Sequence, residues 1–262
     1  MNKLGIIFLH HKTDDVTINN LQSFKKWNPD AVFVTMSPDE ALPGGYSIQN
    51  MPDWLEKWKV QTSKPDMLAK STDLLIYAWY ANRKENCEKW LIVEWDTFCN
   101  CSVEDYFGQL IEQDLVGAYI QVLGKDNWYW FPQLNSFPEI LHKNAAGIVP
   151  MSLVLVSDTA LNSIYKSLDV FNNNFGAGNG ELRFATLAKF AGHEAIHNSI
   201  GAGINEPIKL PENLYIKHGM FHPIKHVVKE KDLTPRVDNI IPFVCVELKI
   251  LKRKISYILK RL

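Results

Sequence analysis

The sequence predicts an α/β fold, a doubly wound sandwich around a mostly parallel sheet. Residues 4–9 form an unbroken apolar run, residues 16–27 have apolar side chains at helical spacing, and residues 31–36 (AVFVTM) again read as a strand. A strand, a helix and a strand within about thirty residues are typical of a βαβ unit, whose strands run parallel. The later segments keep alternating between strand-like runs and helical spacing of apolar residues, which is the pattern of an α/β sheet protein.

The remaining elements continue this alternation. Helices are expected over residues 71–83, 157–168 and 181–190, and strands over residues 90–94, 115–120 and 148–156. Residues 37–52 are rich in Pro and Gly and predict a loop. In open sheets of this kind, ligands bind beyond the carboxyl ends of the strands, which directs attention to residues 10–12 and 94–96.

Bulk composition narrows the classes of function. The chain has 262 residues, of which 46% are hydrophobic, enough for one large α/β domain. A formal net charge of −1 provides no basic field for nucleic acid, so we expect no nucleic-acid partner. The four cysteines have neither CxxC nor disulfide-framework spacing, which favours free thiols in a reducing compartment. The N-terminal apolar run is too short for a signal peptide, and no stretch is long enough to span a bilayer. We therefore expect a cytoplasmic protein.

Two acids end the strand predicted at residues 90–94. Glu94 and Asp96 are two residues apart, so in an extended segment their carboxylates point the same way. Left alone, the two would repel and raise one another's pKa, whereas a bound Mg²⁺ or Mn²⁺ would remove that cost. The other interpretation is a solvated turn with ordinary surface acids. Spacing alone leaves both open.

Residues 89–97 (KWLIVEWDT) and residues 70–79 (KSTDLLIYAW) resemble segments of glycosyltransferases with the nucleotide-diphospho-sugar (GT-A) fold. The first looks like the family's DxD segment, and the second is similar to the preceding helix, which carries a donor-contacting Asp. Residues 147–152 (GIVPMS) resemble the strand that enters the acceptor side.

Two further segments extend this resemblance. Residues 180–187 (GELRFATL) resemble a helix start found in core-2-type N-acetylglucosaminyltransferases, and residues 217–225 (KHGMFHPIK) resemble the C-terminal His/Lys segment that closes over the diphosphate. The five motifs run in the family's order between about residues 4 and 226.

The resemblance implies a single GT-A domain over residues 1–240, a three-layer sandwich that moves a hexosyl or N-acetylhexosaminyl group from a nucleotide-diphospho-sugar to a hydroxyl of a glycan or lipid-linked acceptor. Cell-surface polysaccharide synthesis is the process that it suggests. It makes Glu181 the general base of an inverting reaction, with Gly180 and Arg183 on the acceptor side. The donor-binding residues are expected to be His10, His11, Asp73, Glu94, Trp95, Asp96 and Lys225.

A Mn²⁺ or Mg²⁺ ion is the cofactor that the DxD likeness implies, held by Glu94, Asp96 and His222. The first acid is Glu where the family pattern has Asp. Core-2-type enzymes work without metal and use basic side chains on the diphosphate instead. Lys217 and Lys225 offer that alternative here, so metal dependence stays open.

Two other functions compete with sugar transfer. His193-Glu194-x-x-His197 matches the HExxH motif of zinc peptidases, in which a helix places both histidines on one face and Glu acts as base. The motif follows Gly192, where the preceding helix is expected to end, and the metzincin extension is absent. A non-catalytic nucleotide-sugar binder is the second alternative.

The C-terminal segment, residues 241–262, predicts a basic amphipathic helix. In residues 246–262 apolar residues follow helical spacing along one face, and lysines and arginines occupy the rest. Such a helix either packs on the domain with a solvated basic side or lies on an anionic membrane, here the inner face of the cell membrane. The second arrangement would suit an enzyme with a lipid-linked acceptor.

Overall fold

The computed structural model describes residues 2–39, 41–58, 67–172, 175, 178–198 and 219–229. The chain divides into two compact units, one made of residues 1–13, 30–95 and 109–198, and the other made of residues 14–29, 96–108 and 199–262. Lys217 and the predicted C-terminal helix lie outside the described residues.

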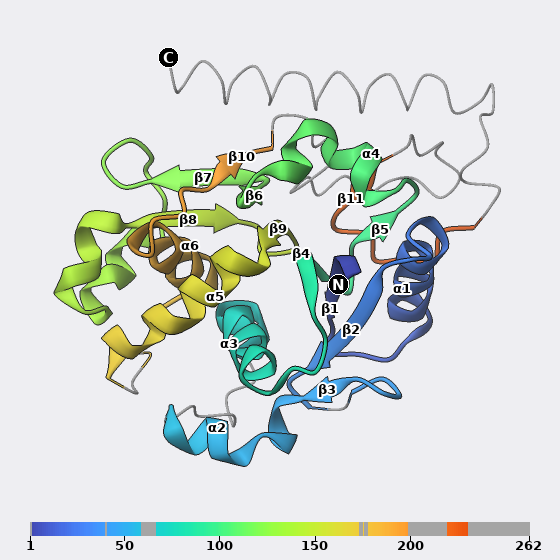
Figure 1. The fold of residues 1–262 in the computed structure, drawn as a ribbon, viewed down its shortest axis with the longest axis horizontal. Coiled ribbons are helices and arrows are strands. Elements are labelled where there is room, and N and C mark those ends of the chain that lie inside the picture. The colour runs from blue at the N-terminus through green and yellow to red at the C-terminus, as the bar shows by residue number, and fades with distance from the viewer. Residues whose placement is uncertain are drawn as a thin grey trace. The chain divides into compact units, whose positions relative to one another are not determined.

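The first unit is built on a seven-stranded sheet in the order β10-β6-β9-β4-β1-β2-β3 (Figure 1). Its strands are β1 (Asn2–Leu9), β2 (Val32–Ser37), β3 (Tyr46–Ser47), β4 (Cys87–Glu94), β6 (Leu115–Gly117), β9 (Leu153–Ser157) and β10 (Ile196–His197). β1 pairs in parallel with β2 and β4, and the pairs β2–β3 and β6–β10 are also parallel. Only β9 runs against its neighbours among these strands. The predicted α/β class with a mostly parallel sheet is confirmed.

The described residues of the first unit form four helices, of which the last three in chain order fall close to predicted segments and the first was not predicted. They are α2 (Pro52–Lys57), α3 (Met67–Asn82), α5 (Asp158–Lys166) and α6 (Gly180–Phe190), with short 3₁₀ turns η1 (Ile48–Asn50), η3 (Phe131–Ser136), η4 (Glu139–Asn144) and η5 (Ser167–Phe171). A further 3₁₀ turn is η2 (Gly108–Glu112). Ser157 caps α5, because its hydroxyl accepts a 3.1 Å hydrogen bond from the Ala160 amide. α3 packs against α6, and α5 packs against β4 and β9.

Two predicted strands are each divided into two. Residues 115–120 form β6 and then β7 (Tyr119–Val122), and residues 148–156 contain the end of β8 (Ala146–Val149) and most of β9. β7 and β8 pair with one another in a separate antiparallel sheet. Pro150 has no amide hydrogen to give to a ladder, so pairing ends there. The predicted loop over residues 37–52 is mostly irregular but contains β3 and η1.

Close packing of β1 on β4 sets the register at the centre of the sheet. Gly5 lies opposite Trp90, and a Cβ on Gly5 would come within 2.2 Å of the Trp90 ring, so only glycine fits there. The residues that follow in β1 are fully enclosed, at most 1% exposed from Ile6 to Leu9. The register pairs Leu9 with Glu94 and Leu9 with Met36, which brings the carboxyl ends of β4, β1 and β2 together.

The second unit is smaller. It contains α1 (Asp15–Trp27), β5 (Phe98–Cys99), α4 (Val103–Phe107) and β11 (Met220–Phe221). β5 and β11 pair antiparallel, and the amide of Cys99 donates to the hydroxyl of Ser23 on α1 at 3.0 Å. Phe98, Ile224 and Val228 form the unit's own small apolar cluster.

Two other expectations, on the cysteines and on membrane-spanning helices, can be compared with the structure. Cys87, Cys99 and Cys101 are free and buried, as predicted, and Cys245 lies outside the described residues. No helix among the described residues combines the length and apolarity that crossing a membrane requires.

Candidate functional site

Strand order locates the candidate site. Along the sheet the chain order 3-2-1-4 reverses between β1 and β4, which makes that gap the topological switch point of the fold. Ligands of open α/β sheets bind at such a point, outside the carboxyl ends of the strands. The residues that leave the sheet here are His10 after β1 and Trp95 after β4, with Glu94 as the last residue of β4.

His10 is held rigidly at the end of β1. Its side chain is 1% exposed, its amide donates to the Met36 carbonyl at 2.8 Å, and its Nδ1 lies 3.0 Å from the carbonyl oxygen of Lys12. Burial lowers the pKa of His10 below its ordinary value, and the nearby His11 adds to that shift, although the hydrogen bond to Lys12 opposes it. His10 therefore favours the neutral imidazole.

Trp95 lies between two basic side chains from the segment that follows β1. The rings of His11 and Trp95 meet edge to face with centroids 5.0 Å apart, and the ammonium of Lys12 lies 3.9 Å from the centre of the Trp95 ring. Sequence reasoning singled out residues 10–12 and assigned His11 and Trp95 to donor binding, but it gave Lys12 no role. Its position as the third residue of the His10-His11-Lys12 run was the available signal.

Within the second unit, Asp96 faces the imidazole of His222 and the ammonium of Lys225. Its side chain is nearly buried, the Nε2 atom of His222 lies 3.1 Å from one carboxylate oxygen, and the Nζ atom of Lys225 lies 3.8 Å from the other. Lys225 keeps two thirds of its side chain exposed, at 66%. This pairing joins three residues that the sequence analysis had assigned to the donor or metal site.

The segment that carries His222 and Lys225 is anchored on both sides. The amide of Ile224 donates to the Asp96 carbonyl at 2.6 Å, and the side chain of Asn20 on α1 donates to the Ile224 carbonyl at 3.2 Å. At the start of the segment, Gly219 and Asn100 exchange hydrogen bonds of 2.7 and 3.1 Å. These hydrogen bonds therefore hold the backbone of the segment in the position from which the His222 and Lys225 side chains reach Asp96.

Three of these side chains have the chemistry of a cation site. Glu94, Asp96 and His222 each offer one ligand atom, and the three atoms lie within 4.8 Å of one another. Carboxylate oxygens suit Mg²⁺ and Mn²⁺, and imidazole is a ligand that transition metals accept more readily than Mg²⁺ does. The residues present thus fit a divalent ion, and Mn²⁺ better than Mg²⁺.

Asp73, Gly180 and Arg183 form a second, buried group. Asp73 is 0% and Arg183 is 1% exposed, and they join through two 2.7 Å hydrogen bonds, from Nε and Nη2 to the two carboxylate oxygens. Arg183 also donates to the Gly178 carbonyl at 2.8 Å. A Cβ on Gly180 would come within 2.5 Å of an Asp73 oxygen. The structure thus places the predicted donor residue Asp73 against the two predicted acceptor residues.

Glu181 is half-buried in the first turn of α6. Its backbone amide is capped by the Asn179 side chain at 2.7 Å, and the amide of Asn179 in turn donates to the side chain of Gln133 at 2.6 Å. The turn leading to Glu181 is thereby fixed by the Asn179 cap as well as by Arg183. Sequence reasoning did not select Asn179 or Gln133, although Asn is a preferred helix N-cap.

The HExxH motif does not form a zinc site of the helical kind. α6 ends at Phe190, and His197 lies in β10, so the two histidines are not on one turn of a helix. His193 Nδ1 lies 3.2 Å from Asp114, and the His197 ring packs 5.8 Å from that of Tyr119. The helical geometry that the peptidase hypothesis requires is absent from this described segment.

Comparison with known proteins yields solved structures alone. No protein-family model matches the sequence, and no curated protein is similar to it. An active-site mutant of LgtC aligns with a TM-score of 0.45 and 11% identity over 94% of this chain and 96% of that one. The galactosyltransferase LgtC with donor and acceptor sugar analogues aligns at 0.42 and 13% over 76% and 75%. Mouse xyloside xylosyltransferase 1 aligns at 0.41 and 9% over 75% and 84%. Because these TM-scores are below 0.5, the fold class stated above rests on the strand topology.

Proposed function

We propose that this chain is a GT-A-type glycosyltransferase that transfers a hexosyl or N-acetylhexosaminyl group from a nucleotide-diphospho-sugar to a hydroxyl group. The observation that carries the proposal is the cluster of Glu94, Asp96 and His222, whose first member ends β4 beside the switch point of the sheet. Open α/β sheets bind small molecules at this position, and two carboxylates with an imidazole suit a cation that is bound to a diphosphate.

The donor's diphosphate is the negatively charged part of the substrate, and its charge grows as the sugar leaves. A divalent ion at Glu94, Asp96 and His222 supplies the countercharge when bound. Lys225 stands 3.8 Å from Asp96 with an exposed ammonium, where it adds a second positive charge. His10, His11 and Trp95 are the proposed nucleotide contacts, since they flank the same strand ends.

Glu181 is the proposed general base on the acceptor side. Its carboxylate takes the proton of the acceptor hydroxyl while that oxygen bonds to the anomeric carbon, and the bond from the same carbon to the diphosphate oxygen breaks. Attack opposite the leaving group inverts the anomeric centre. In this scheme the cap from Asn179 and the Asp73–Arg183 pair hold the turn that carries Glu181.

Glu181→Gln isolates the role of the base. General-base catalysis contributes about 10²–10⁴-fold, so we expect turnover to fall by that factor while donor affinity, measured by calorimetry, stays at the wild-type value. Gln keeps the size and the helix position of the side chain. A collapse of donor affinity with little change in turnover would remove Glu181 from this role.

A donor screen tests the proposed function as a whole. Nucleotide-diphospho-sugars are added to the full chain with Mn²⁺ or with EDTA, and the melting temperature is recorded, because a ligand that binds the native state raises it. We expect at least one donor to stabilise the protein with Mn²⁺, and EDTA to abolish the shift. A shift that survives EDTA would assign the diphosphate to Lys225 and Lys217. No shift with any donor would contradict the proposal, and nucleotide-sugar hydrolysis without acceptor would argue against a mere binder.

For the acceptor we propose a glycan or lipid-linked glycan in cell-surface polysaccharide synthesis, reached from the cytoplasmic side. The basis is the sequence pattern of residues 246–262, where each basic residue near an anionic bilayer adds about 1 kcal/mol. Binding to phosphatidylglycerol vesicles is expected to fall with salt and to vanish on deletion of residues 246–262. Equal binding to phosphatidylcholine vesicles would reduce the segment to a packing element.

A further inference from the structure

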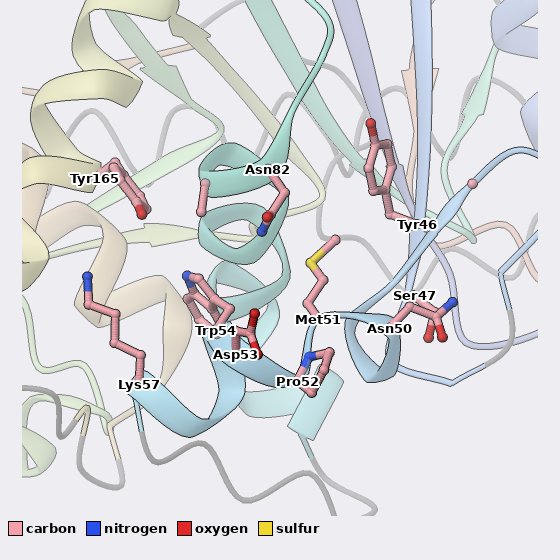
Figure 2. Close-up of a pocket in the computed structure, with 12 residues that line it drawn as sticks. Tyr46, Ser47, Asn50, Met51, Pro52, Asp53, Trp54, Lys57, Asn82 and Tyr165 are labelled. Carbon is pink, nitrogen blue, oxygen red and sulfur yellow. The ribbon is translucent and has the colours of Figure 1, made fainter.

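A cavity of about 470 Å³ opens between β3, α2, α3 and α5, and it shares no residue with the candidate site described above. Its walls come from Tyr46 on β3, Asp53 and Trp54 on α2, Asn82 at the end of α3 and Tyr165 on α5. The volume falls within the range of about 300–1,000 Å³ that small-molecule sites occupy. Figure 2 shows the side chains of Trp54, Asn82 and Tyr165 directed toward the space between the three helices.

The polar atoms on this wall combine donors with acceptors. The indole nitrogen of Trp54, in a residue that is only 5% exposed, faces the Tyr165 hydroxyl but does not reach full hydrogen-bond geometry with it. A buried donor of this kind calls for an acceptor, from a ligand or from water. Asn82, which lines the cavity, donates to the Ala78 carbonyl at 3.0 Å through its amide nitrogen, so its side-chain oxygen is the acceptor that it can offer to a ligand.

The wall carries little net charge. Asp53 and Lys57 are the charged residues that line the cavity, one of each sign, and the ammonium of Lys57 lies 5.1 Å from the centre of the Trp58 ring. A nucleotide or a phosphate would therefore meet no excess of positive charge here. Aromatic rings, an amide and a phenol suit a ligand that has many hydroxyl groups and no charge, because a hydroxyl both donates and accepts.

We propose that this cavity is a saccharide-binding site that holds one neutral pyranose unit. The ligand's hydroxyls accept from the Trp54 indole and bond to the Tyr165 hydroxyl and the Asn82 oxygen, and the ring of Tyr165 forms part of the wall. The site is distinct from the proposed reaction centre, so its occupancy does not depend on the transfer reaction. In the proposed enzyme it would retain a distal part of the glycan.

Saturation-transfer NMR tests the site with a panel of methyl pyranosides of gluco, galacto, manno and N-acetylglucosamine configuration on the full chain. Signal from at least one member is expected, and Tyr165→Phe, which removes the hydroxyl alone, is expected to weaken its binding by about tenfold. Asn82→Ala is expected to weaken it similarly. Tyr129→Phe is the matched control, since Tyr129 is 73% exposed and does not line the cavity.

Asp96→Asn separates this proposal from the proposed function. Binding of the pyranoside is expected to be unchanged in that variant, even when donor binding is lost. No signal from any member of the panel, or a signal that Tyr165→Phe and Asn82→Ala leave unaltered, would overturn the site. Loss of the signal in Asp96→Asn would place the sugar at the strand ends and would overturn it equally.

Discussion

The sequence assigned both Asp96 and Asp73 to donor binding, and the structure gives the two aspartates different surroundings. Asp73 is fully enclosed, and both of its oxygens are 2.7 Å from the guanidinium of Arg183. Asp96 meets His222 at 3.1 Å and Lys225 at 3.8 Å, and the Lys225 side chain is 66% exposed.

The two carboxylates differ in whether they can exchange their present partners for a cation or a substrate. Asp73 cannot turn to a substrate without leaving the buried Arg183 guanidinium unpaired, which is costly in the interior. Asp96 can accept a cation or face a diphosphate while Lys225 moves into solvent at little cost. A carboxylate is thus available for chemistry when its partners can leave, and a carboxylate whose partner is itself buried serves to hold the backbone. Two experiments test this contrast, and a third tests how firmly the end of β1 is enclosed.

Asp73→Asn should have the largest effect, and on stability. Removing one partner of a buried ion pair costs about 3–5 kcal/mol, because the remaining charge stays buried without compensation. We expect the free energy of unfolding, measured in urea, to fall by that amount. Asp30→Asn, at an exposed position, is the control and should change it by less than about 0.5 kcal/mol. A folded, fully stable Asp73→Asn protein would remove the distinction drawn here.

Much of the fold that frames these two aspartates follows from local pattern. The apolar runs that became β1 and β4 and the helical spacing of α1 are visible in the sequence, and the register then follows from the tight fit of Gly5 on Trp90. The split between β8 and β9 was not predicted, because the apolar residues on both sides of Pro150 read as one interrupted strand and not as strands of two sheets.

The candidate site was predicted less completely, because it depends on contacts between distant parts of the chain. Asp73 and Arg183 are 110 residues apart, and no local pattern shows that the two side chains pair. The grouping of Glu94 and Asp96 with His222 was anticipated only through a family resemblance. The Lys12–Trp95 contact needed the strand register before it could be foreseen.

Asp96→Asn should leave stability almost unchanged and affect activity instead. Loss of one group that stabilises developing charge typically lowers turnover about 10²–10³-fold, so transfer should fall at least that far. The unfolding free energy should stay within about 1 kcal/mol of wild type, because the Lys225 side chain is 66% exposed and its ammonium stays solvated without its partner. Near-normal transfer by this variant would remove Asp96 from the proposed site, and Asp30→Asn again serves as the control.

His10 offers the smallest effect and a test of how firmly the strand end is enclosed. Burial holds its pKa in the folded protein below the ordinary value of 6.5, so the unfolded chain takes up the proton first as pH falls. The stability that His10 contributes is therefore fully present above pH 6.5 and is lost as pH falls through the lowered pKa of the folded state. A single such group gives a slope of at most about 1.4 kcal/mol per pH unit.

His10→Asn should flatten the fall in unfolding free energy between pH 6.5 and 5, measured by urea titration at each pH. His142→Asn is the matched control, since His142 also faces a carbonyl, that of Phe137 at 3.2 Å, but is less buried. An unchanged slope in His10→Asn would mean that water reaches His10, and the enclosed strand end would lose its support.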